Sequence, residues 1–85
     1  MLLPTVHLNG TSAQALFDAN RRAAAAVHDA IAAMSEAYPN GRDFYPQGAN
    51  AINVAMEEHR TRVRKLEEVA KDLEEIALHC LYWVS

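Results

Sequence analysis

The chain has 85 residues, of which 51% are hydrophobic and 22% are charged, and its formal net charge is −3. This length supports one domain at most. A negative net charge argues against generic nucleic-acid binding, which depends on a positive surface. No stretch approaches the roughly 20 apolar residues that a membrane-spanning helix needs, and the single cysteine, Cys80, excludes an intrachain disulfide.

The first residues, Met1 to Thr5, lack the basic segment and apolar core of a signal peptide. Together with the lone thiol, this leads us to expect a cytoplasmic protein. Alanine supplies much of the apolar content, so one copy buries little apolar area. Small chains without disulfides or metals commonly gain stability by self-association, and we therefore expect a homo-oligomer, a dimer or higher.

Residues 1–10 form a short β-prone segment interrupted by Pro4, which predicts an extended N-terminal arm ending in an Asn9-Gly10 turn. Thr11 follows as the expected N-cap of a helix. Gln14 stands three residues later, as a capping box requires.

The alanine-rich stretch 12–37 predicts the first helix, because alanine is the strongest helix former. The larger residues follow one stripe with spacings of three and four, which is the pattern of a buried helix face. Members of this stripe are Leu16, Asn20, Ala23, Val27, Ile31, Met34 and Tyr38. Small alanines beside the stripe would let a partner helix approach closely. The helix is expected to stop at Tyr38-Pro39, because a residue before proline disfavours helical geometry.

The stretch 49–84 predicts a second helix, with Asn50 as its cap. Apolar residues recur at alternating spacings of four and three, as in a heptad repeat. Members of this seam are Ile52, Met56, His59, Val63, Leu66, Ala70, Leu73, Ala77, Cys80 and Val84. A flanking row, Val69, Ile76 and Trp83, widens the apolar stripe and favours a helical bundle over a two-stranded coil.

The sequence therefore predicts an all-α fold, a single helical-hairpin domain with an extended N-terminal arm that oligomerises into a helical bundle. We expect Met34 to lie opposite Ile52, and Val27 opposite His59. In this register the second helix outruns the first by about ten residues at its C-terminal end, and the arm or a second subunit covers the overhang.

Residues 38–48 form the predicted connector, with two prolines and two glycines that reverse the chain. Its other side chains are typical of recognition sites, and we predict a ligand-binding site there. An arginine fork suits phosphate, aromatic rings offer stacking surfaces, and amide and carboxyl groups can bind polar edges. The residues are Asn40, Arg42, Asp43, Phe44, Tyr45 and Gln47. The alternative is a rigid loop with a purely structural role.

A basic belt is the second candidate. In the expected register Arg21 lies opposite Lys65 and Arg22 opposite Arg64, and two such pairs could hold a polyanion. The alternative is solvated surface charge paired with nearby glutamates. The turn at residues 7–12 could bind an anion at a helix start, although capping already explains it.

The histidines lack metal-ligand spacing, and His59 fits a core or interface position. We expect Cys80, which lies in the seam, to be buried and inert. No P-loop is present, and the adjacent glutamates Glu57-Glu58 and Glu67-Glu68 lack the E-x-x-E and E-x-x-D spacings of all-α nucleotide pyrophosphohydrolases. The sequence therefore predicts no metal, no cofactor and no enzymatic activity.

Three pieces, residues 5–12, residues 39–48 (PNGRDFYPQG) and a following helix with His59, resemble a group of small proteins encoded by phages and prophages. The resemblance implies expression in the cytoplasm of an infected bacterium. It also implies a role against host defence, by trapping a nucleotide signal or by blocking a defence protein.

From these observations we expect a non-catalytic binding protein of phage origin that sequesters a nucleotide-type ligand. The alternatives are a protein-binding inhibitor of a host defence factor and a structural or assembly adaptor.

Overall fold

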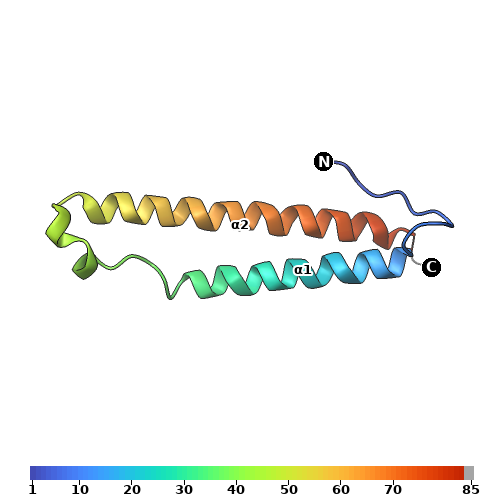
Figure 1. Cartoon of the computed structure of the whole chain (residues 1–85), viewed down its shortest axis with the longest axis horizontal. Helices are drawn as coiled ribbons and strands as arrows, with labels where there is room; N and C mark the ends of the chain where they lie inside the picture. Colours follow the sequence, from blue (N-terminus) through green and yellow to red (C-terminus); the bar gives the residue numbers. More distant parts are fainter. Residues whose placement is uncertain (84–85) are drawn as a thin grey trace.

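The computed structural model describes residues 1–83. Two long helices, α1 (Ala13–Met34) and α2 (Ala51–Leu81), are joined by a connector with two short 3-10 turns, η1 (Gly41–Asp43) and η2 (Tyr45–Gln47). Figure 1 shows α1 and α2 lying side by side and antiparallel, with the connector at one end and the start of α1 beside the end of α2. The predicted all-α hairpin is confirmed.

The seam between α1 and α2 contains most of the residues that the spacing predicts, but Ala13, Ala24 and Ala55 are buried as well and were not predicted. Tyr38, the last predicted stripe position of the first helix, lies beyond α1 and is 42% exposed. Every predicted seam position within Ala13–Met34 and Ala51–Leu81 is buried or half-buried. Its centre is made of small side chains, since Ala24 is 4% exposed, Ala70 1% and Cys80 0%. Small residues let the two backbones approach closely, so the core is thin. The predicted burial of Cys80 is confirmed, whereas Val84 lies outside the described residues.

The N-cap of α1 is Ser12, so the prediction of Thr11 is wrong. The Ala15 N–H donates to Ser12 Oγ at 3.1 Å. Gln14 does not close a capping box, because its Nε2 donates to Asp18 Oδ1, one turn further along. Either hydroxyl fits an N-cap, and the backbone bond from Leu16 N–H to Ser12 O fixes the choice.

The C-terminus of α1 comes at Met34, three residues before the predicted end. The N–H groups of Ser35, Glu36 and Ala37 donate to carbonyls three residues earlier, which tightens the chain into 3-10-like turns. Two carbonyls there accept a second bond, Ala32 O from Ser35 Oγ and Met34 O from His59 Nε2. The chain therefore leaves the helix before Tyr38-Pro39 is reached.

The connector is longer than predicted, because α1 ends early and α2 begins at Ala51. Asn50 is the N-cap residue of α2, but its side chain does not cap a backbone N–H. Its Oδ1 instead accepts from Asn53 Nδ2 at 3.1 Å.

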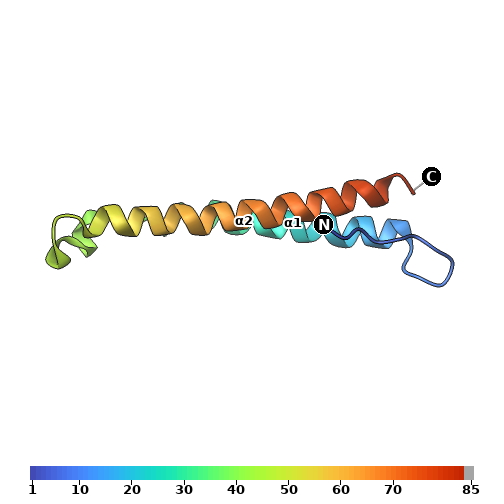
Figure 2. The same cartoon turned by 90° about the horizontal axis from the view of Figure 1, so that it is seen from above.

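The predicted register is wrong. His59 lies at the end of α1, where its Nε2 donates to Met34 O at 2.9 Å, and is therefore not opposite Val27. Further along, His28 Nε2 contacts Glu74 Oε1 at 2.6 Å. The prediction assumed that the chain reverses directly after α1, whereas the connector first runs on beside the opening turns of α2 (Figures 1 and 2).

The overhang of α2 consequently lies at the connector end, which also contradicts the prediction. At the other end the arm folds back along α2 (Figure 1), and His79 Nε2 donates to Pro4 O at 2.9 Å. The extended arm is thus confirmed. The arm covers the end of α2 only in part, because several apolar side chains there stay exposed. They are Leu78, Leu81, Tyr82 and Trp83.

The molecule is a rod of 61 × 21 × 17 Å. Its radius of gyration is 18.6 Å, against about 12 Å for a compact domain of this length. Its accessible surface is 6349 Å², against about 5,000 Å² for a compact monomer of this mass. Among the described residues, no helix is long and apolar enough to cross a membrane.

Candidate functional site

The connector is shaped partly by its own polar side chains. Asn40 Oδ1 accepts hydrogen bonds from the Arg42 backbone N–H at 2.9 Å and from Arg42 Nε at 3.2 Å. Asn40 thereby caps η1 and holds the base of the Arg42 guanidinium. Both residues are exposed. Asn40 therefore holds the Arg42 guanidinium in position at the surface. The sequence predicts that Asn40 itself binds the ligand.

The second half of the connector ends at a glycine that its backbone requires. Gly48 has φ 115° and ψ 164°, a conformation that is almost exclusive to glycine. Pro46 lies within the first turn of η2, where its missing N–H is not needed. Between the two turns Phe44 is half-buried, whereas Tyr45 is 75% exposed.

A hollow of about 500 Å³, here called the connector hollow, lies between the connector and the first turns of α2. Its size falls within the range of about 300–1,000 Å³ that small-molecule sites occupy. It exists because α2 extends past α1, so that the connector packs against the overhang. The lining residues are Glu36, Ala37, Tyr38, Pro39, Asn40, Asp43, Phe44, Ala55, Glu58, His59 and Arg62.

Three of the six predicted connector residues, Asn40, Asp43 and Phe44, line this hollow. The other three, Arg42, Tyr45 and Gln47, lie at exposed positions outside it. The structure therefore brings half of the predicted connector residues together at one hollow, and their role in ligand binding stays a prediction. The remaining half could reach only a ligand that extends beyond the hollow.

The charges around the hollow are mostly negative. Glu36, Asp43 and Glu58 contribute carboxylates, and Arg62 contributes the one guanidinium among its lining residues. Carboxylates accept hydrogen bonds and repel anions. The interior of the hollow thus favours a group rich in N–H donors, and a phosphate fits better at its outer edge.

Tyr38 and His59 form a wall that the sequence did not identify. Their ring centroids lie 5.1 Å apart with an interplanar angle of 71°, an edge-to-face arrangement. His59 is 4% exposed. Both residues line the connector hollow on one side and, on the other, a groove of about 410 Å³ between α1 and α2. Sequence spacing placed His59 in the seam, but its contact with Tyr38 depends on the path of the connector.

The groove has an apolar floor and charged edges. Ile31, Met34 and Val63 lie at its base, and Arg60, Arg64 and Glu67 are among its other lining residues. The groove is therefore a second place where an apolar group could bind.

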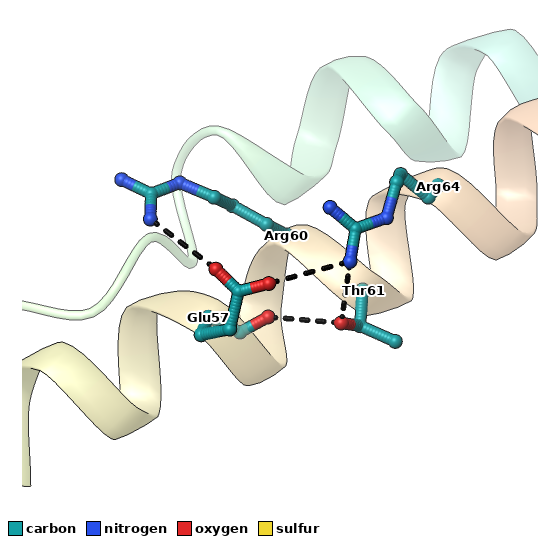
Figure 3. Close-up of polar contacts among 4 residues, drawn as sticks. All are labelled: Glu57, Arg60, Thr61 and Arg64. Atoms are coloured by element: carbon teal, nitrogen blue, oxygen red, sulfur yellow. Dashed lines mark hydrogen bonds and ion pairs between the residues drawn. The ribbon is translucent and has the colours of Figure 1, made fainter.

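Figure 3 shows that the two arginines of the groove reach toward one carboxylate, that of Glu57. Arg60 Nη1 lies 3.6 Å from Glu57 Oε2, and Arg64 Nη2 lies 3.4 Å from Oε1. Arg64 Nη2 also donates to Thr61 Oγ1 at 3.0 Å. All three charged side chains are more than half exposed, so these pairs contribute little stability. Because Glu57 partly neutralises the charge of Arg64, Arg64 is less able to bind an anion.

The predicted basic belt is not formed. Arg21 lines a hollow with Glu74 and Leu78 of α2, and Glu74 is about 15 Å along the helix from Arg64. Arg22 lies with Arg21 and Asp18 on the outer surface of α1. Neither arginine therefore meets Arg64 or Lys65 within one hairpin, because the true register moves α1 toward the end of α2.

Within residues 1–83, no group of three or more His, Cys, Asp or Glu side chains is arranged to hold a metal ion. No protein-family model, no curated protein and no solved structure matches the chain. The site must therefore be interpreted from its own geometry.

Proposed function

We propose that this chain is a non-catalytic binding protein that acts as a homo-oligomer and holds a small nucleotide-type ligand at the connector hollow. The observation that carries the proposal is the hollow itself, about 500 Å³ between the connector and α2, lined by Phe44, Asn40 and Asp43. A single hairpin thus offers a concave site of suitable size with an aromatic ring and polar groups together.

The lining suggests how such a ligand binds. A planar base packs against Phe44 or Tyr38, and its amino and imino groups donate to Asp43, Glu58 or Asn40. Arg62 at the hollow and Arg42 outside it are the nearest partners for a phosphate. Because three carboxylates surround the hollow, a ligand with one or two phosphates is favoured over a polyphosphate.

The proposal that the protein binds its ligand without catalysing a reaction rests on the contacts of His59. Its Nε2 donates to Met34 O and its ring packs against Tyr38. Both contacts hold the imidazole as part of the wall. A protein that sequesters a ligand needs only to bind it and needs no catalytic group. The aromatic and polar groups of the connector are sufficient for such binding.

The proposed biological setting rests on the resemblance of residues 5–12 and 39–48 to small proteins of phages and prophages. A phage protein that binds a nucleotide signal in the host cytoplasm would lower its free concentration and so weaken a defence response. This step depends on the resemblance alone.

A thermal-shift screen tests the proposal. Nucleobases, nucleosides, mononucleotides and cyclic nucleotides are added separately, and a bound ligand raises the unfolding temperature because it stabilises the native state by RT ln(1 + [L]/Kd). We expect Asp43→Asn and Arg42→Ala to reduce the shift. The matched control is Asp29→Asn, an exposed carboxylate on α1 that does not line the hollow. The absence of a shift with every compound would overturn the proposal.

A protein partner is the second candidate, favoured by the apolar end of the rod. Leu81 is 45% exposed, Tyr82 85% and Trp83 55%, and a hollow of about 320 Å³ lies against Leu78, Leu81 and Tyr82. Aromatic residues in such clusters commonly anchor protein interfaces. If a purified host factor binds and Leu81→Asp removes that binding while Asp43→Asn does not, this second function replaces the first.

A further inference from the structure

The two faces of the hairpin differ in charge. On one face, Arg21 and His28 of α1 line a hollow together with Glu74 of α2. On the same face, Arg60 and Arg64 of α2 line the groove at the end of α1. This face is charged along its whole length. Residues two positions further along a helix lie about 200° around its axis, so they belong to the opposite face.

The opposite face, here called the alanine–valine face, is different in composition. Its α2 row has alternating spacings of three and four, which keep residues on one side of a helix. The row begins near the connector with Arg62, which lines the connector hollow, and continues with Lys65, Val69, Asp72 and Ile76. Its α1 row carries no charge and consists of Ala19, Ala23, Ala26, Ala30 and Ala33. Except for the half-buried Ala23 and Ile76, these residues are exposed, and Val69 is 46% exposed.

The rod exposes more surface than a compact chain of its mass. The accessible surface of 6349 Å² exceeds that of a compact monomer by about 1,300 Å². A standard stable interface buries about 800 Å² on each partner. The excess is therefore large enough for one such interface per copy.

We propose that a second copy of this chain docks on the alanine–valine face, with the two α2 helices antiparallel and crossing near Val69. In this arrangement Lys65 of each copy lies beside Asp72 of the other, because the two residues are nearly equidistant from Val69. The pairing is self-complementary, as a two-fold interface requires. The alanine rows of the two α1 helices then meet without a buried charge, and the assembly is a four-helix bundle.

The charges also exclude the other two-fold arrangement of this face. If α2 of one copy packed on α1 of the other, Lys65 and Asp72 would both lie against alanines. Each would lose water without gaining a partner, which is costly. The antiparallel α2 pair avoids this cost.

Multi-angle light scattering and sedimentation of the ligand-free full chain test the proposal, so the result does not depend on the connector hollow. We expect a dimer for the wild type. Lys65→Asp places like charges together and is expected to weaken self-association about tenfold or more. The double variant Lys65→Asp with Asp72→Lys restores the opposite charges and is expected to restore the dimer.

Two alanines provide a matched pair for the α1 side of the interface. Ala26→Glu puts a charge on the alanine–valine face and is expected to give a helical monomer. Ala25 is also exposed but lies beside Arg21 and Asp18 on the outer surface of α1, so Ala25→Glu is expected to leave the dimer intact. A monomeric wild type, equal effects of the two alanine variants, or a double charge variant that stays monomeric would each overturn the proposal.

Discussion

The buried His59 ring of α2 donates a hydrogen bond from Nε2 to the Met34 carbonyl at the end of α1, at 2.9 Å. This bond joins two residues that lie 25 positions apart in the chain. It is the second hydrogen bond to this carbonyl, which also accepts from the Ala37 N–H just beyond the helix. It sets the position along α2 at which α1 ends. The Tyr38 ring packs edge-on against the same imidazole. The pair therefore links the hairpin register to the wall of the connector hollow.

Replacing His59 by alanine should destabilise the fold strongly. The substitution leaves a void in the seam and removes a buried hydrogen bond, which together cost about 2–3 kcal/mol. Urea unfolding followed by far-UV circular dichroism measures this loss. His28→Ala is the control, because His28 is more than half exposed and its loss should cost less than about 0.5 kcal/mol. Equal losses in the two variants would show that His59 has no special structural role.

Substitutions at the start of α1 show whether the hydroxyl of Ser12 or that of Thr11 caps the helix. Ser12→Ala removes the acceptor of the Ala15 N–H and should cost about 1 kcal/mol. Thr11→Ala should be nearly neutral, because the side chain of Ser12 is the one that caps the helix. The free energies of unfolding from chemical denaturation compare the two directly. A larger loss for Thr11→Ala would place the cap at Thr11, as the capping-box pattern had suggested.

The sequence was sufficient to predict the fold at the level of elements. Period and spacing identified both helices and most seam residues from Leu16 to Met34 and from Ile52 to Cys80, because burial on a helix follows its 3.6-residue repeat. The buried Ala24 and Ala55 were missed, because the stripes were traced through the larger side chains. The sequence was not sufficient for the register. Sliding one helix past the other by about a turn keeps the stripe positions in the seam, and the contacts of His59 and of His28 show which alternative the structure adopts.

The candidate site was predictable as a region but not as a set of residues. The connector's composition pointed to Asn40, Asp43 and Phe44, which do line the hollow. Glu58 and Arg62 also line it, and they were missed because they lie on α2 and meet the connector only in the folded chain. The pairing of Arg21 with Lys65 was an inference from the register, so it failed together with the register.

Two glycines of the connector should respond differently to the same change. Gly48 has φ 115°, so Gly48→Ala forces a side chain into a conformation that costs about 1–3 kcal/mol. Gly41 has no positive φ, and a Cβ placed there would meet nothing within 4 Å. Gly41→Ala should therefore be neutral or stabilise by up to about 1 kcal/mol. The midpoints of urea unfolding compare the variants, and a neutral Gly48→Ala would show that the connector relaxes at this turn.

The N-terminal arm should be released by one substitution on α2. His79 Nε2 donates to Pro4 O, and Pro4 and Val6 are half-buried whereas Leu2 is 95% exposed. We therefore expect this hydrogen bond to be a main attachment of the arm to α2. His79→Ala should cost about 1 kcal/mol and should speed proteolysis within the arm without changing the helical content. His7→Ala is the control, because His7 is exposed and lies in the turn that Gly10 closes. If the arm of the His79→Ala variant is cleaved no faster than that of the control, apolar packing of Pro4 and Val6 holds the arm and the hydrogen bond does not.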